Sequence, residues 1–319
     1  MTDVADLPGV GEKTAEKLKE AGFIDMMSIA AAAPAELAAV AGLGDATSEK
    51  IIEAAREALD LGFEQATKVY EKRLAIARIT TGSKALDNLL GGGIETGAVT
   101  EFHGAYGSSK SQVAHQLAVN VQLPKEKGGL DGTCIFIDTE ATFRPERIIQ
   151  MAKAVGLDQE KALENIFVAR AYNSDHQKVL IEKAGEMIKE RNVKLIIVDS
   201  ATAHFRVDFS GRGDLASRQQ KLNRYLHSIQ RLADVYNIAV YITNQVMANP
   251  GLLFGDPTTP IGGHVMGHFS TYRVYVRRGK AGTRVARMVD SPNLPEAECV
   301  FQITEDGVRD VDDKKKGDD

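Results

Sequence analysis

Two patterns of apolar and polar residues follow one another along the chain. Through the first sixty residues, apolar side chains recur three and four positions apart, which is the spacing of amphipathic helices. From about residue 81, helical patterns at 110–121, 146–155, 176–190 and 215–236 alternate with short apolar runs. These runs are Ala98 to His103, Cys134 to Asp138, Ile166 to Ala169, Leu195 to Asp199 and Ile238 to Thr243. Short buried strands that alternate with helices predict an α/β domain with a mostly parallel sheet covered on both faces.

The pattern changes again after Thr271. Residues 272–277, 284–289 and 299–304 are predicted to be consecutive strands at one end of the sheet. The last residues are charged, which favours a disordered tail. The pattern therefore divides the chain into a helical domain (1–60), a linker (61–80), an α/β core (81–308) and a tail (309–319).

The helical domain contains an internal repeat. The turns at 7–11 and 40–44 share an apolar-x-Gly-x-Gly pattern, and each precedes a helix, at 12–21 and at 45–58. Glycines there permit positive φ and leave backbone N–H groups open at a helix start, where a phosphate can bind. The pair is similar to a helix-hairpin-helix module, which binds DNA. Because this segment is acidic, a helical bundle with glycine-rich turns and no ligand is the alternative.

Composition narrows the class of protein. The chain has 319 residues, 43% of them hydrophobic and 26% charged, which suits one large and one small soluble domain. The net charge of −5 excludes a surface coated with DNA-binding charge, so a nucleic-acid site must be local or supplied by repeated subunits. No apolar run could cross a bilayer and no secretory start is present. Cys134 and Cys299 have no partner at metal spacing and are predicted to be reduced core thiols, so we expect a cytoplasmic location without membrane contact.

A phosphate-binding loop is predicted between an apolar strand and a helix. The segment reads Gly104-Ala105-Tyr106-Gly107-Ser108-Ser109-Lys110-Ser111, with Gln112 next in the helix. Small residues let backbone N–H groups close around the phosphates, while Lys110 supplies a charge and Ser111 a hydroxyl for Mg²⁺. Ser109 departs from the usual pattern, which has Gly at this position.

Two acidic residues follow later strands. Asp199 ends the run Leu195-Ile196-Ile197-Val198, an arrangement that points a carboxylate at the metal's water shell. Glu140 follows the strand that ends at Asp138, and ligands bind at the carboxyl ends of strands in open α/β sheets. A carboxylate there can orient and deprotonate the water that attacks the γ-phosphate. Together with the phosphate loop, these residues predict a P-loop ATPase.

Several further motifs match one family. The chain resembles the archaeal RadA recombinases of the RecA superfamily over nearly its whole length. The matching segments are Thr81 to Gly93, Phe143 to Arg147, Ala169 to Asn173, Gly211 to Gly213, Arg218 to Gln220 and Ile261 to His264. The resemblance implies a RecA-like core, ATP and Mg²⁺ as ligands, with K⁺ as a further candidate cation, and partners that are single-stranded DNA, double-stranded DNA and copies of the same chain.

The resemblance also assigns roles to individual residues. Arg147 matches the arginine on which adenine stacks, Glu140 the catalytic base, and Gln245 the residue that senses the γ-phosphate. Asp290-Ser291-Pro292 resembles the cap that covers ATP from a neighbouring subunit, and His268 matches a further contact across that interface. Without the family, His268 would be an ordinary loop or core histidine.

Two segments are predicted to be DNA-binding loops. The first, 206–218, holds Arg206, Arg212, Gly213 and Arg218; the second, 246–263, is long, carries three prolines, has no strand pattern and ends in Gly262 and Gly263. Arginines can pair with phosphates, and long structureless loops in compact domains are usually functional. A further basic cluster at 273–287 either guides duplex DNA or protects a sheet edge with charge.

The linker carries a candidate assembly motif. Phe63 and Ala66 lie three apart, on one face of a turn, and resemble the family's polymerisation motif, in which the two side chains fill pockets on the next subunit. From spacing alone, packing of Phe63 within its own domain is an equal alternative. A filament or a ring of subunits would follow from the motif.

The sequence therefore predicts an ATP-dependent recombinase that pairs and exchanges homologous DNA strands in repair. One rival is a recombination mediator with a damaged phosphate loop, which Ser109 favours and Lys110, Ser111 and Glu140 oppose. The other is a hexameric DNA helicase with the same core, which the Phe63–Ala66 motif opposes.

Overall fold

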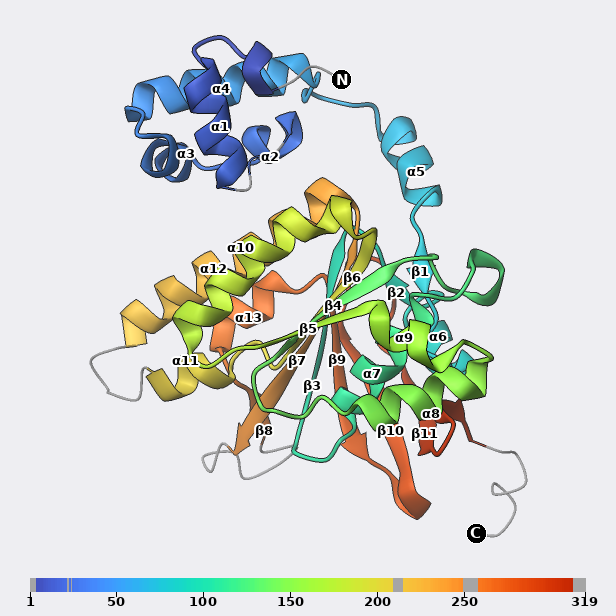
Figure 1. The fold of residues 1–319 in the computed structure, drawn as a ribbon. Coiled ribbons are helices and arrows are strands. Elements are labelled where there is room, and N and C mark those ends of the chain that lie inside the picture. The colour runs from blue at the N-terminus through green and yellow to red at the C-terminus, as the bar shows by residue number, and fades with distance from the viewer. Residues whose placement is uncertain (1–3, 22, 24, 209–214, 249–257, 312–319) are drawn as a thin grey trace. The chain divides into compact units, whose positions relative to one another are not determined.

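The computed structural model describes residues 4–21, 23, 25–208, 215–248 and 258–311 (Figure 1). Backbone contacts divide the chain into two compact units, Met1–Ile76 with Ile181–Met187, and Ala77–Leu180 with Ile188–Asp319. Each unit is built around its own apolar core. No helix among the described residues combines the length and the apolar character that a bilayer crossing needs.

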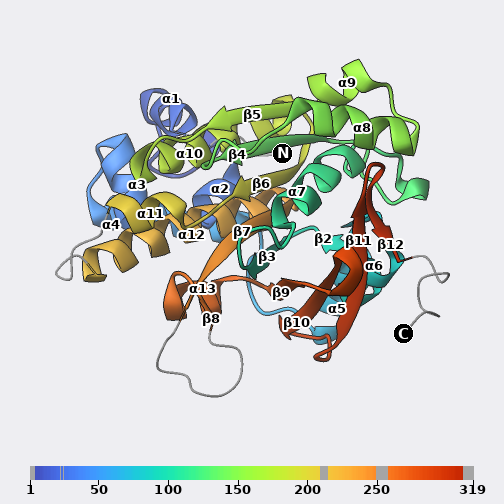
Figure 2. The same ribbon diagram turned by 90° about the horizontal axis from the view of Figure 1, so that it is seen from below.

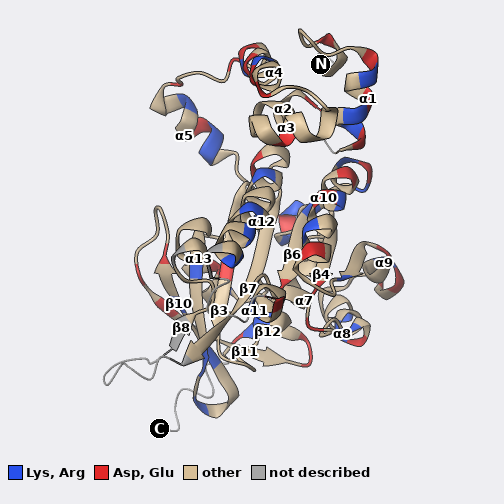
Figure 3. Ribbon diagram, turned by 90° about the vertical axis from the view of Figure 1, so that its left-hand side faces the viewer, with Lys and Arg blue, Asp and Glu red and all other residues tan. Residues whose placement is uncertain are grey.

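The N-terminal domain is all-helical, as its apolar spacing predicts. Its elements are the 3-10 turn η1 (Val4–Asp6) and the helices α1 (Glu12–Glu20), α2 (Met26–Ala30), α3 (Pro34–Ala41) and α4 (Asp45–Ala58). The two repeated turns have one geometry: Gly9 and Gly42 have φ of 86° and 65°, while Gly11 and Gly44 are extended residues that precede α1 and α4. Both signs of charge are mixed on α1 and α4 (Figure 3).

The linker contains one helix, α5 (Ala66–Leu74), which has no buried residue. Phe63 precedes it and is fully exposed, with Val69, Tyr70 and Leu74 exposed on the helix itself. The described residues leave the Phe63 side chain uncovered. The alternative prediction, that Phe63 packs inside its own domain, is therefore wrong.

The core has the alternating elements that the sequence predicts, with short additions. Its strands are β1 (Arg78–Ile79), β2 (Ile94–Glu95), β3 (Ala98–Gly104), β4 (Thr133–Asp138), β5 (Ile166–Arg170), β6 (Val193–Asp199), β7 (Ala239–Ala248), β8 (Thr258–Pro260), β9 (Tyr272–Arg278), β10 (Thr283–Asp290), β11 (Glu298–Thr304) and β12 (Gly307–Asp310). Its helices are α6 (Lys84–Leu89), α7 (Lys110–Asn120), α8 (Pro145–Val155), α9 (Gln159–Glu164), α10 (Ser174–Glu190), α11 (Ala203–Asp208), α12 (Leu215–Tyr236) and α13 (Gly263–Phe269), with 3-10 turns η2 (Lys125–Lys127) and η4 (Lys280–Gly282).

The main sheet has the described strands in the order β12-β11-β10-β9-β3-β7-β6-β4-β5, and β8 pairs with β7 outside that row. Strands β5, β4, β6, β7, β3 and β9 are parallel, whereas β10, β11 and β12 continue the sheet antiparallel (Figure 2). The prediction of a helical N-terminal domain, followed along the chain by an α/β core with a mostly parallel sheet, is confirmed.

Helices cover both faces of the parallel part, with α7 to α9 and α11 to α12 on opposite sides (Figure 1). Leu195 and Ile197 of β6 pack in one cluster with Val113 and Leu117 of α7. The intervening residues point the other way because side chains alternate along a strand. These central strands are therefore apolar at nearly every position, and in the sequence they form continuous apolar runs without polar alternation.

Two predicted boundaries differ from the structure. The sequence pattern predicts no strand within 246–263, yet β7 runs to Ala248 and Thr258–Pro260 pairs with it as β8. Three-residue strands with prolines carry no period that a sequence can show. Likewise, Arg309 and Asp310, assigned to the tail, lie in β12. The Asp310 carboxylate accepts hydrogen bonds from Ser83 Oγ and from the Lys84 and Ala85 N–H groups at the start of α6.

Candidate nucleotide and DNA site

The phosphate loop connects β3 to α7. Gly107 and Ser109 have positive φ, 75° and 80°, which turns the chain into the helix, and no side chain caps the first turn of α7. Its backbone N–H groups are thus open to an anion at the positive end of the helix. The Tyr241 hydroxyl donates to the Lys110 carbonyl at 2.9 Å and anchors the helix start to β7. This geometry fits a bound phosphate chain.

The Lys110 ammonium lies within the loop, and the residue is 8% exposed. It donates to the carbonyls of Gly104 at 2.8 Å and Ala105 at 3.1 Å, and to Ser108 Oγ at 3.3 Å. Burial lowers the pKa of Lys110, while the carboxylates of Asp199 and Glu140 oppose that shift. The lysine is therefore a buried charge held by neutral groups of the loop, as a phosphate ligand requires.

Asp199 ends β6 beside the phosphate loop and is 3% exposed. Its carboxylate accepts hydrogen bonds from Thr243 Oγ1 at 2.5 Å and Thr142 Oγ1 at 3.4 Å. Among the described residues, no group of three or more His, Cys, Asp or Glu side chains could hold a metal ion. One carboxylate and one hydroxyl, Asp199 and Ser111, are nevertheless the donor set that suits Mg²⁺ bound with substrate phosphates.

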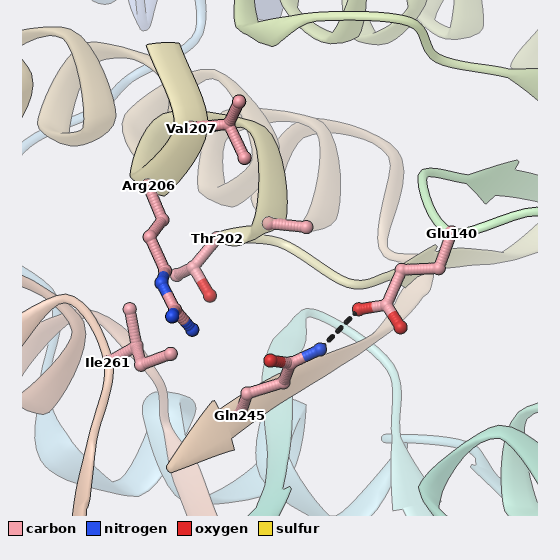
Figure 4. Close-up of a pocket in the computed structure, with 7 residues that line it drawn as sticks. Glu140, Thr202, Arg206, Val207, Gln245 and Ile261 are labelled. Atoms are coloured by element: carbon pink, nitrogen blue, oxygen red, sulfur yellow. Dashed lines mark hydrogen bonds between the residues drawn. The ribbon is translucent and has the colours of Figure 1, made fainter. Parts of the chain in front are cut away.

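Glu140 follows β4 and faces Gln245 of β7. Its Oε1 accepts a hydrogen bond from Gln245 Nε2 at 2.8 Å (Figure 4) and another from Ser200 Oγ at 3.0 Å. Since β3, β7, β6 and β4 are neighbours in the sheet, their carboxyl ends bring together Lys110, Gln245, Asp199 and Glu140. The structure thus gathers the predicted catalytic residues at one edge.

The turn that carries Glu140 is held by two residues that the sequence did not single out. The Asp138 carboxylate accepts from the N–H groups of Glu140, Thr142 and Phe143, each at 3.1 Å. His115 bridges this turn to the phosphate-loop helix, because its Nε2 accepts from the Arg144 N–H at 3.1 Å while its Nδ1 meets the Ser111 carbonyl. Burial lowers the pKa of His115, which keeps it neutral for both bonds.

Arg147 lies on α8 with its guanidinium fixed on several sides. Its Nε donates to Gln112 Oε1 at 2.8 Å, and its terminal nitrogens donate to the carbonyls of Thr304 and Glu305, each at 2.6 Å. These bonds hold the guanidinium plane in one orientation, which a flat surface for stacking of the adenine base requires.

A pocket of 270 Å³ adjoins Glu140 and Gln245. Thr202, Ala203, Arg206, Val207 and Ile261 complete its lining, and Arg206 points into it from α11 (Figure 4). A smaller hollow beside it is lined by Arg206, Arg218 and Gly262 among others. Side chains from both predicted DNA segments therefore converge next to the nucleotide site.

The first DNA segment is more helical than the sequence suggested. Arg206 lies in α11 and Arg218 in α12, so neither belongs to a loop. A six-residue helix is too short to show a helical period. Arg212 and Gly213 lie outside the described residues. Gly262, with φ of 96°, and Gly263 stand at the start of α13, which also carries the exposed His268.

The basic cluster does not protect a sheet edge, because β9 and β10 are both paired on two sides. All five of its arginines have intramolecular partners. Arg273 pairs with the fully buried Glu101 at 2.8 Å. Arg287 and Arg277 pair with Glu296 at 2.8 Å and Glu298 at 3.6 Å, while Arg278 and Arg284 donate to the phosphate loop.

The predicted cap, Asp290-Ser291-Pro292, begins with the last residue of β10. Asp290 pairs in register with Arg273, and Arg273 with Glu101, in the middle of β3. Because β10 runs antiparallel to β9 and β3, the chain continues after Asp290 away from the phosphate loop, which follows Gly104 at the end of β3. This arrangement suits a contribution to another protomer's site.

Comparisons with known proteins agree with this geometry. A family model described as Rad51 matches residues 72–311, and one described as a SAM-like helix-hairpin-helix tandem matches residues 1–57. The chain is 54% identical over 308 residues to the DNA repair and recombination protein RadA of Aeropyrum pernix, with 97% of each chain covered. The resemblance seen in the sequence is confirmed, and the chain belongs to the Rad51 family.

Proposed function

We propose that this protein is an ATP-dependent DNA recombinase, which assembles on single-stranded DNA and exchanges strands with a homologous duplex. The observation that carries the proposal is the hydrogen bond between Gln245 and Glu140, with Arg206 and Thr202 in the same pocket. Through this contact and this pocket, the proposed nucleotide site adjoins residues at the ends of both proposed DNA-binding segments. Family membership and the RadA relative support the same function.

ATP would bind across the phosphate loop, with Lys110 and the N–H groups at the start of α7 on its phosphates and adenine on Arg147. Mg²⁺, held by Ser111 and Asp199 together with phosphate oxygens, would neutralise charge that develops on the phosphates. Asp290, Ser291 and Pro292 of a neighbouring protomer would close the site, so that nucleotide binding and assembly are coupled.

Glu140 would accept a proton from the water that attacks the γ-phosphate. Gln245 holds the same carboxylate at 2.8 Å, and β7 continues from Gln245 toward the second DNA segment. A bound strand that shifts this segment would change the Glu140–Gln245 contact and thereby the rate of hydrolysis. Turnover would then loosen the filament.

DNA would contact Arg206 and Arg218, with Arg212 and Gly213 between them and Gly262 and Gly263 on the second segment. Arginines bind the phosphate backbone without reading sequence, and homology is read by base pairing. Phe63 and Ala66 would join each subunit to the next, and the N-terminal helix-hairpin-helix domain would bind duplex DNA through its glycine turns.

Strand exchange tests this proposal. The full chain, with Mg²⁺ and ATP, is incubated with a labelled single strand and either a homologous or a heterologous duplex. We expect a joint product with the homologous duplex alone, and none from Lys110→Ala. Unwinding of a forked duplex without strand transfer would favour a helicase instead, and the absence of both activities would favour a mediator.

A further inference from the structure

Ser109 occupies a backbone conformation that side chains disfavour. Its φ of 80° and ψ of 20° are left-handed, and the usual phosphate-loop pattern has glycine here. A Cβ in this region disfavours the conformation by about tenfold. Something in the structure must offset this cost if the loop is to keep its phosphate-binding shape.

The offset comes from the β9–β10 hairpin. Arg284 Nε donates to Ser109 Oγ at 2.7 Å. The same guanidinium donates through Nη1 to the carbonyls of Gly282 and Thr283, each at 2.8 Å, so it is fixed to its own hairpin. The hairpin is itself fixed, because β9 pairs with β3 and β10 with β11. Arg284 therefore joins the phosphate loop to a rigid part of the sheet.

A second arginine of the hairpin reaches the same loop. Arg278 Nε donates to the Gly107 carbonyl at 3.2 Å, and Arg278 stands opposite Arg284 in the strand register. Like charges placed opposite each other on a sheet are destabilising. Within the part of the chain that the structure describes, neither arginine forms an ion pair with a carboxylate. Two cations without a counter-charge against a phosphate loop suit a polyphosphate ligand.

We propose that Arg284 is a positioning residue of the nucleotide site, and that it acts through Ser109. The hydrogen bond holds the loop in its phosphate-binding conformation despite the side chain at a glycine position, and the hairpin adds positive charge to the loop. The inference rests on the proposed binding of ATP. It also makes Ser109 a compensated substitution instead of a defect, which counts against the mediator alternative.

The pair predicts a specific pattern of nucleotide affinities. Ser109→Ala keeps the Cβ and loses the hydrogen bond, so most molecules leave the binding conformation and the Kd for ATP rises about tenfold. Ser109→Gly loses the bond and the strain together, so its Kd stays within about threefold of the unaltered chain. Arg284→Met should raise the Kd about tenfold in the unaltered chain, but about twofold or less when it is added to the Ser109→Gly variant.

The experiment titrates each full-length variant with a fluorescent ATP analogue and Mg²⁺, without DNA, and records thermal unfolding without nucleotide. Arg287→Met is the matched control, since it removes an equal charge from the same strand and should leave the Kd unchanged. Equal losses from Arg284→Met in both backgrounds, or a Ser109→Ala variant that binds as tightly as the unaltered chain, would overturn the inference alone. An unaltered chain that binds no ATP would overturn the proposed function and the inference with it.

Discussion

Replacement of Phe63 by alanine separates the stability of the protomer from the stability of the assembly. Phe63 has a relative exposure of 112%, and no residue of the following helix α5 is buried. Truncating a fully exposed ring removes no contact from the folded chain. We therefore expect the protomer of Phe63→Ala to unfold at the same temperature as the unaltered protomer.

The loss should appear only between subunits. Complete burial of a phenylalanine side chain contributes about 2–3 kcal/mol. Because each 1.4 kcal/mol is tenfold in an equilibrium constant, one such contact changes subunit association by about 30- to 150-fold. In a polymer every subunit repeats the contact, so mean length should fall steeply at a given protein concentration.

Light scattering across a range of protein concentrations, without DNA, measures this effect. Val40→Ala is a suitable control, because it shortens an exposed apolar side chain of the N-terminal domain, on α3. We expect Val40→Ala to form particles of unaltered size and Phe63→Ala to form much smaller ones. Unaltered particles from Phe63→Ala, or a protomer that becomes less stable, would refute the reasoning.

Two further outcomes follow from the site, and a third follows from His103, a buried residue of β3. Glu140→Gln should bind ATP normally and hydrolyse it about 10²–10⁴ times more slowly in a phosphate-release assay, and unchanged turnover would remove Glu140 as the base. Replacing Arg212 and Arg218 by alanine should weaken single-strand binding for every sequence and flatten its salt dependence by about 0.7 per lost phosphate contact, so an unchanged slope would place the DNA elsewhere. Burial lowers the pKa of His103 from 6.5 to about 4, so the unfolded chain takes up a proton in that window and the folded chain does not. The free energy of unfolding should therefore fall by about 3 kcal/mol as pH drops from 6.5 to 4. Urea titrations of His103→Gln should show a decrease that is smaller by this amount over the same pH range.

Much of the core could be predicted because its signals are local. The phosphate loop lies within eight consecutive residues, and Asp199 and Glu140 are marked by the apolar strands before them. Two-sided burial makes those strands continuous apolar runs, so the parallel sheet was visible in the sequence. Element boundaries near β8 and α11 were missed, because segments of three to six residues show no period.

The residues that support the site could not be found in this way. His115 and Arg144 are 29 positions apart, and Arg284 and Ser109 are 175 apart. Only the fold brings these pairs together, and a histidine on an apolar helix or an arginine in a strand has other common roles. Asp138 had one usable signal, since it ends a strand two residues before Glu140 and a carboxylate there can accept several backbone N–H groups.

Phosphate release with and without single-stranded DNA tests the central claim most directly, since it requires the nucleotide site and the DNA segments to act together. The full chain with Mg²⁺ and ATP should hydrolyse ATP slowly alone and severalfold faster once single-stranded DNA is added, and Lys110→Ala should show neither rate. A chain that binds single-stranded DNA but releases phosphate at the same rate with and without it would contradict the coupling through Glu140 and Gln245.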